Sequence, residues 1–197
     1  NHRFHMISRS ELFLDAVKNV MDGLDIDIVI MGAKGTTNES PAKYGKNTLK
    51  IIQNIRNRPV LVVPENAVLD LPKEIVLATN FNTEFDVSEI NYLVEIAKIN
   101  NARIQILSSV NIGQMTPVQE KNKILLKRKL DGVEHEFNVL INEGIFKALN
   151  RFTKVRHNSM ISYLDKKPSI LQILGLKKTF LDKLGYDNKL PILALHQ

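Results

Sequence analysis

The sequence contains no cysteine and no tryptophan among its 197 residues. Without cysteine there can be no disulfide, no zinc–thiolate site and no thiol catalysis. This absence is compatible with a reducing cytoplasm, where we expect the protein to reside. No apolar run approaches the roughly 18 to 20 residues that a membrane-spanning helix needs, so no membrane partner is expected. The hydrophobic share of 44% and the charged share of 24% are typical of globular proteins.

The positive net charge of +6 has its densest cluster between Lys121 and Lys129, where basic residues alternate with leucine and isoleucine. Such a cluster suits either a nucleic-acid or anionic-lipid surface, or the solvated face of an amphipathic helix. No aromatic residue is interleaved with these charges as a base-stacking platform would require. We therefore interpret the segment as an amphipathic helix and expect no nucleic-acid partner.

Residues typical of catalytic and metal sites are scattered. The five histidines form no H-x-x-x-H or acid-flanked pair, so we expect surface or edge histidines and no metal site. No G-x-S-x-G occurs, so no Ser–His–Asp machinery and no catalytic residue is assigned. Lys166 and Lys167 precede Pro168 at the start of a possible helix. They are interpreted as solvated lysines in preference to an anion site.

Apolar runs of strand length alternate with helical patterns along the chain, which predicts an α/β fold with a parallel sheet. A helix over Leu12–Met21 is expected to begin with Ser10 as cap and to stop at Gly23, and another follows Asp86. The predicted strands are Ile26–Met31, Pro59–Val63, Glu74–Thr79, Arg103–Ser109, Phe137–Ile141, Met160–Tyr163 and Pro191–Leu195.

The chain also contains an internal repeat. Segments such as Glu11–Val17 and Glu143–Leu149, or Pro59–Val63 and Pro191–Leu195, follow one another in the same order about 132 residues apart. We assign residues 1–66 to the last part of a first unit, 67–72 to a linker, and 73–197 to a complete second unit. The repeat places His2–Ile7 as the third strand of the first unit, so roughly 70 residues of that unit are expected to be absent.

The polar loop that follows the first predicted strand contains three glycines. Two residues separate Gly32 from Gly35, and nine separate Gly35 from Gly45. A glycine loop between a strand and a helix allows close backbone approach, and the helix N-terminus favours an anion. The loop matches neither the Walker A motif nor the dinucleotide fingerprint. The spacing alone leaves open a phosphate cradle and a flexible loop.

The segment Asp25–Pro64 resembles the C-terminal part of a universal stress protein domain. That family has the motif G-x2-G-x9-G-S/T before its fourth helix, followed by a Pro-Val-Leu-Val-Val strand. Gly32, Gly35 and Gly45 match in type and spacing, whereas Lys46 stands where Ser or Thr belongs. The resemblance covers the whole chain, as in tandem members, although the second unit resembles the family in element order more than in motif.

The resemblance implies a flavodoxin-like five-stranded sheet in the order 3-2-1-4-5 and ATP binding by some members. ATP is then a possible ligand of the intact protein, with weak or absent binding by this chain. The implied binding residues are Gly32, Gly35, Gly45, Lys46, Asn47 and Thr48.

The second unit departs from the family pattern at the positions that would hold ATP. Asn80 stands where an aspartate would hold the adenosine, and Leu164, Lys167 and Leu176 stand where the glycines belong. Side chains at glycine positions obstruct close approach of phosphate to the backbone. We therefore expect this second site to be degenerate.

Three functional classes follow: a stress-response binding or regulatory protein, a weak ATPase or nucleotidyl-transfer enzyme, and an interaction module that has lost nucleotide. The first is favoured, because no carboxylate except Glu39 is placed to hold Mg²⁺ in or just after the loop. The resemblance also implies that the fifth strands, Pro59–Val63 and Pro191–Leu195, pair within the chain. An open sheet edge in the first unit then predicts a homodimer formed through residues 1–66.

Overall fold

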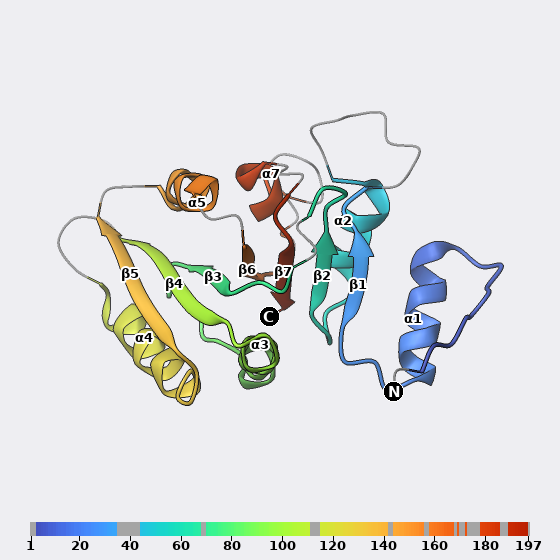
Figure 1. Cartoon of the computed structure of the whole chain (residues 1–197), viewed down its shortest axis with the longest axis horizontal. Coiled ribbons are helices and arrows are strands. Elements are labelled where there is room, and N and C mark those ends of the chain that lie inside the picture. Colours follow the sequence, from blue (N-terminus) through green and yellow to red (C-terminus); the bar gives the residue numbers. More distant parts are fainter. Residues whose placement is uncertain are drawn as a thin grey trace.

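The computed structural model describes residues 3–34, 44–67, 70–110, 115–141, 144–155, 158–167, 169, 172, 178–185 and 189–196. Helices and strands alternate through this part of the chain, except that β3 follows β2 (Figure 1). The elements are α1 (Phe13–Gly23), β1 (Val29–Gly32), α2 (Lys46–Asn54), β2 (Val60–Val63), β3 (Glu74–Thr79), α3 (Val87–Asn100), β4 (Arg103–Val110), α4 (Pro117–Lys129), β5 (His135–Ile141), α5 (Ile145–Val155), β6 (Ser159–Asp165), α7 (Phe180–Leu184) and β7 (Ile192–His196).

The seven strands form one sheet in the order β1-β2-β7-β6-β3-β4-β5. From β5 to β7, the five strands of the later part of the chain are parallel to their neighbours. Numbered within that part alone, their order is 3-2-1-4-5. The predicted α/β class and the predicted order of this set are therefore confirmed.

The first part of the chain repeats the end of this pattern. The order α1-β1-α2-β2 recurs as α5-β6-α7-β7, and β1 pairs parallel with β2 as β6 does with β7. Strands β2 and β7 pair antiparallel, with Val60 opposite Ala194 and Val62 opposite Ile192. The two sets of strands therefore join through one antiparallel ladder into a continuous sheet.

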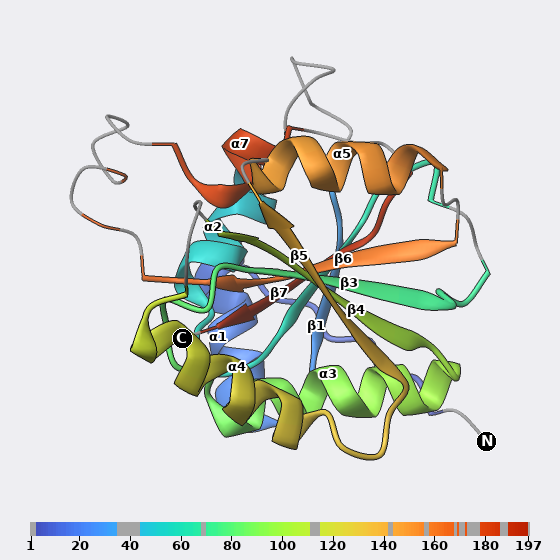
Figure 2. The ribbon, with the colours of Figure 1, turned by 90° about the vertical axis from the view of Figure 1, so that its left-hand side faces the viewer.

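Helices cover both faces of the sheet, as the nearly continuous apolar strands require. Viewed from β5, α5 and α7 lie above the sheet and α3 and α4 below it (Figure 2). The upper core also receives α2 and the inner side of α1, and is centred on Ile51, Val62, Ile161 and Tyr163. The lower core is centred on side chains such as Ile75, Leu93 and Ile106.

Local signals explain where several helices begin. The Asp86 carboxylate accepts a hydrogen bond from the Ser88 backbone amide at 2.8 Å, which caps α3, and the helix follows Asp86 as expected. Thr116 and Gln119 form a reciprocal capping box at α4, and the Pro at position 117 suits the first helical turn. In α4 only Asn122 and Leu126 are buried, so its basic side chains form the expected solvated face.

The N-terminal expectations need correction. Ser10 does not cap α1, because the N-cap residue is Leu12 and no side chain bonds to the helix start. The first predicted strand begins three residues late, at Val29, and ends at Gly32. Residues 3–7 of the predicted strand His2–Ile7 have no strand structure, and Phe4 and Met6 are fully or nearly fully exposed. The ladder has no strand beyond β1 among the described residues for this segment to join.

Among the described residues, no helix combines the length and the apolar character needed to cross a membrane.

Candidate glycine-loop site

The glycine loop, residues 32–45, connects β1 to α2 at the carboxyl end of a parallel strand, where open α/β sheets commonly bind ligands. Its two ends, Gly32–Lys34 and Tyr44–Gly45, lie within the described residues. The predicted site residue Gly35 and the acidic residue Glu39 lie outside them. The geometry of the site therefore comes from the two ends of the loop and the first turn of α2.

Backbone and side-chain hydrogen bonds hold the two ends of the loop together. The Gly45 amide donates to the Ala33 carbonyl at 2.8 Å, and the Ala33 amide donates to Val63 at 2.9 Å. The buried Thr48 hydroxyl lies 3.0 Å from the Gly32 carbonyl oxygen and 3.2 Å from that of Ala33. This hydroxyl has one proton, and both oxygens nearby are acceptors. Thr48 therefore braces the loop instead of facing solvent.

The protein's own packing does not require glycine at either end of the loop. A Cβ on Gly45 would lie 3.4 Å from the Lys34 Cα, and one on Gly32 would lie 3.4 Å from the Lys34 carbonyl oxygen. Both are ordinary van der Waals distances, and neither glycine has a positive φ. The absence of side chains thus leaves the backbone open to a group outside the chain.

The first turn of α2 is suited to an anion. Gly45 is the N-cap, no side chain of the described residues caps the helix, and the first turn contains no acidic residue. The first amide bonded within the helix is that of Leu49, which donates to the Gly45 carbonyl at 3.0 Å. Lys46 and Asn47 are exposed. Their amides at the positive end of the helix dipole, with the Lys46 ammonium, favour a phosphate-like ligand.

The positions that the predicted repeat aligns with this loop in the later part of the chain have different surroundings. Leu164 packs against the lower core, and Lys167 is exposed. The Asn80 side chain accepts a hydrogen bond from the Asn82 amide at 3.1 Å, which is a local turn contact. Leu176 and Pro168 lie outside the described residues.

A partly buried ion pair that sequence reasoning missed joins the first part of the chain to the carboxyl end of β6. The Arg56 guanidinium donates to the Asp165 carboxylate at 2.6 Å and also to its backbone carbonyl. The two side chains are only 18% and 16% exposed. Burial raises the pKa of Asp165, while the hydrogen bond and charge of Arg56 act to lower it. Because the partners are 109 residues apart, no local sequence pattern predicts their contact.

His196 lies beside this ion pair, since it is opposite Asp165 in the ladder of β6 and β7. Its side chain is buried in a central strand and both ring nitrogens lack a hydrogen-bond partner in the described structure, so the expectation of a surface or edge histidine is wrong here. Burial, with a smaller contribution from the charge of Arg56, lowers the pKa of His196 to about 4. The imidazole is therefore neutral at pH 7.

Glu89, in the first turn of α3, contacts His196. Its carboxylate accepts the His196 backbone amide at 2.7 Å. Burial raises the pKa of Glu89, and the hydrogen bond from His196 lowers it. The described residues contain no group of three acidic or histidine side chains placed to hold a metal ion.

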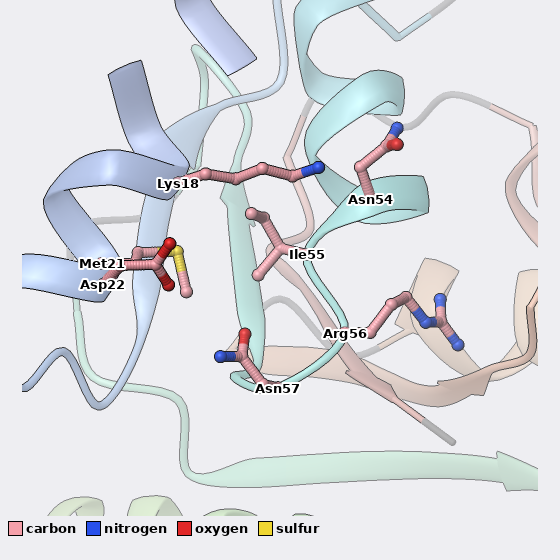
Figure 3. Close-up of a pocket in the computed structure, with 7 residues that line it drawn as sticks. All are labelled: Lys18, Met21, Asp22, Asn54, Ile55, Arg56 and Asn57. Carbon is pink, nitrogen blue, oxygen red and sulfur yellow. The ribbon is translucent and has the colours of Figure 1, made fainter. Parts of the chain in front are cut away.

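A cavity of about 250 Å³ lies between the C-terminal ends of α1 and α2, away from the glycine loop (Figure 3). Its lining includes Lys18, Asp22, Asn54 and Asn57. The Arg56 side chain points away from Lys18 and Asp22 in this view, consistent with its bond to Asp165. The cavity thus lies at the opposite end of α2 from the candidate anion site.

Comparison with known proteins finds no matching protein-family model and no matching curated protein. Several solved structures match the chain, among them three that match over most of its length. A universal stress protein from Archaeoglobus fulgidus matches with a TM-score of 0.64 and 13% identity, covering 91% of this chain and 66% of that protein.

Two proteins from Pseudomonas aeruginosa also match. A putative universal stress protein has a TM-score of 0.59 and 12% identity, and a protein of unknown function has 0.60 and 11%. Each match covers 95% of this chain and 69% of the other. The chain thus spans about two thirds of the length of the structures it matches. At these identities the likeness concerns architecture, and the chain has the fold of universal stress proteins.

Proposed function

We propose that this chain is a binding protein of the universal stress protein type, and that its glycine loop holds the phosphate groups of a nucleotide such as ATP. The observation that carries the proposal is the braced loop in front of a helix that no side chain of the described residues caps. Hydrogen bonds from Gly45 and Thr48 fix the loop ends, while the amides at the start of α2 remain open to an anion.

Within this proposal each residue has a distinct role. Gly32 and Gly45 leave room for close approach of the phosphate to the backbone, and Gly35 shares this role by its place in the motif. Lys46 supplies positive charge, Asn47 donates hydrogen bonds, and Thr48 keeps the loop in position. The second unit contributes its fold and the Asp165 partner of Arg56, and we propose no second nucleotide site in it.

Binding rather than turnover is proposed because the first turn of α2 offers no acidic side chain to hold Mg²⁺. The competing function is weak ATP hydrolysis at the same loop. Release of inorganic phosphate in proportion to the protein concentration, lost in the Gly45 variant below, would favour that enzyme instead.

Calorimetric titration with tripolyphosphate and with ATP tests the proposal, because tripolyphosphate isolates the phosphate contacts. Gly45→Val should weaken tripolyphosphate binding at least tenfold, because its side chain would occupy the proposed phosphate position. Gly144→Val is the matched control. Gly144 also directly precedes a helix, α5, and its Cβ would meet no atom within 4 Å.

Lys46→Gln provides a second variant at an exposed position, where loss of folding is not expected. It should weaken binding and reduce the dependence of affinity on salt, because one cation is lost. Unchanged affinity in both the Gly45 and Lys46 variants would overturn the proposal, as would an equal loss in the Gly144 control.

A further inference from the structure

Helix α2 connects the candidate phosphate site to the later part of the chain. Gly45 is its N-cap, Ile55 is its C-cap, and Arg56 follows directly. Its nine residues rise by about 14 Å, and so short a helix moves as one rigid body. Whatever fixes the C-terminal end of α2 therefore also helps to fix the amides of its first turn.

A contact with strand β6 fixes this C-terminal end. The Arg56 side chain points away from Lys18 and Asp22 of α1 (Figure 3), and its guanidinium donates to both the carboxylate and the backbone carbonyl of Asp165. Two bonds from one planar guanidinium to one residue define its orientation as well as its distance. Since Asp165 is the last residue of β6, the end of α2 is bonded to a central strand of the sheet.

The N-terminal end of α2 lies close to the same strand. Tyr44, which directly precedes the N-cap, is buried in the same core cluster as Tyr163 of β6. Burial raises the pKa of Tyr163, and interactions with Asp165, Tyr44 and Arg56 modify it further. Side chains at both ends of α2 therefore lie within electrostatic range of a single β6 side chain.

We infer that Arg56 and Asp165 are positioning residues for the phosphate site and act on it through α2. The inference rests on the proposed function, because it concerns the same site. Arg56 lies at the opposite end of the helix from that site, so the pair acts by setting where the amides of Lys46 and Asn47 are held. Hydrogen-bond distances span a window of only about 0.5 Å, so a small displacement of α2 weakens the contacts of these amides with a phosphate.

Arg56→Lys tests the inference without changing the net charge. Lysine offers a compact ammonium in place of the planar guanidinium, so the ion pair can persist while the fixed orientation is lost. Calorimetric titration with tripolyphosphate should show an affinity at least about threefold lower than that of the natural chain. The free protein should also show shifted backbone amide resonances of Lys46 and Asn47.

Arg58→Lys is the matched control. Arg58 is half-buried like Arg56 and lies two residues later, but it contacts Asp25, Ile26 and Asn57 in the first part of the chain. This change should alter tripolyphosphate affinity by less than about twofold.

Asp165→Asn provides a second variant, for which simple electrostatics and the positioning role predict opposite results. Loss of a negative charge alone would tighten the binding of an anion. Loss of the charged partner of Arg56 should instead weaken it, again at least about threefold.

The outcomes separate this inference from the proposed function. Unchanged affinity in Arg56→Lys, an equal loss in Arg58→Lys, or tighter binding by Asp165→Asn would each overturn the positioning role and leave the phosphate site standing. A natural chain that does not bind tripolyphosphate would overturn the proposed function, and this inference with it.

Discussion

Replacing Arg56 by methionine should strongly destabilise the fold at neutral pH. The substitution keeps a long apolar side chain but removes the guanidinium that is bonded to the partly buried Asp165 carboxylate at 2.6 Å. Breaking a buried ion pair costs about 3 to 5 kcal/mol. Because the two side chains are only partly buried, at 18% and 16% exposure, we expect a smaller cost than this, about 2 to 4 kcal/mol.

The pH dependence gives this prediction a distinctive signature. Burial already raises the pKa of Asp165, and loss of Arg56 should raise it further. A carboxyl whose pKa is raised on folding favours the folded state at low pH, and this benefit is lost as the pH rises through the folded pKa. The deficit of Arg56→Met should therefore be largest near pH 7.5 and should shrink as Asp165 is protonated at lower pH.

Urea denaturation followed by circular dichroism at pH 7.5 and pH 5 measures both effects. The control is Arg9→Met, because Arg9 is half exposed and its contact with Glu11 is 3.8 Å long; a change below about 0.5 kcal/mol is expected there. The double variant Arg56→Met, Asp165→Leu should be less destabilised than the sum of the single changes. A pH-independent loss below about 1 kcal/mol for Arg56→Met would refute the reasoning.

Two further predictions concern His196 and Thr48. The pKa of His196 falls from 6.5 to about 4 on folding. As the pH falls across that window, this group should therefore lower the free energy of unfolding of the natural chain by about 3 kcal/mol. His196→Leu should remove this contribution to the slope of unfolding free energy against pH. An unchanged slope would contradict the lowered pKa of His196. The raised pKa values of Glu89 and Asp165 act in the opposite sense, in the natural chain and in the variant alike. Thr48→Val should cost about 1 to 2 kcal/mol in urea denaturation by removing the hydroxyl that braces the Gly32 and Ala33 carbonyls, and Thr48→Ser should restore most of it. Equal stability of Thr48→Val and the natural chain would count against the bracing role.

The sequence predicts strongly patterned elements closely. Glu74–Thr79 has the predicted bounds, because its apolar run, Ile75–Ala78, is buried on both faces of the sheet. The start of α3 is likewise set by a local signal, the Asp86 cap. At the N-terminal end no comparable packing fixes the structure. There the predicted strand at His2–Ile7 and the predicted Ser10 cap were wrong.

The candidate site can be predicted only in part from the sequence. The glycine spacing indicates the place of the loop, but it does not show that the Thr48 side chain turns inward to the Gly32 carbonyl. The contact of Arg56 with Asp165, like that of Glu89 with His196, joins residues more than 100 positions apart. Such contacts depend on the order and register of the strands, which no short motif specifies.

The most direct test of the central claim is a titration of the isotope-labelled chain with tripolyphosphate, followed by the backbone amide resonances. The amides of Gly45, Lys46 and Asn47 should shift saturably and together, because they border the proposed phosphate position at the start of α2. Amides of the basic helix α4, near Lys127, serve as an internal reference for non-specific anion binding. Shifts confined to α4, with those three amides unmoved at saturating tripolyphosphate, would contradict the account.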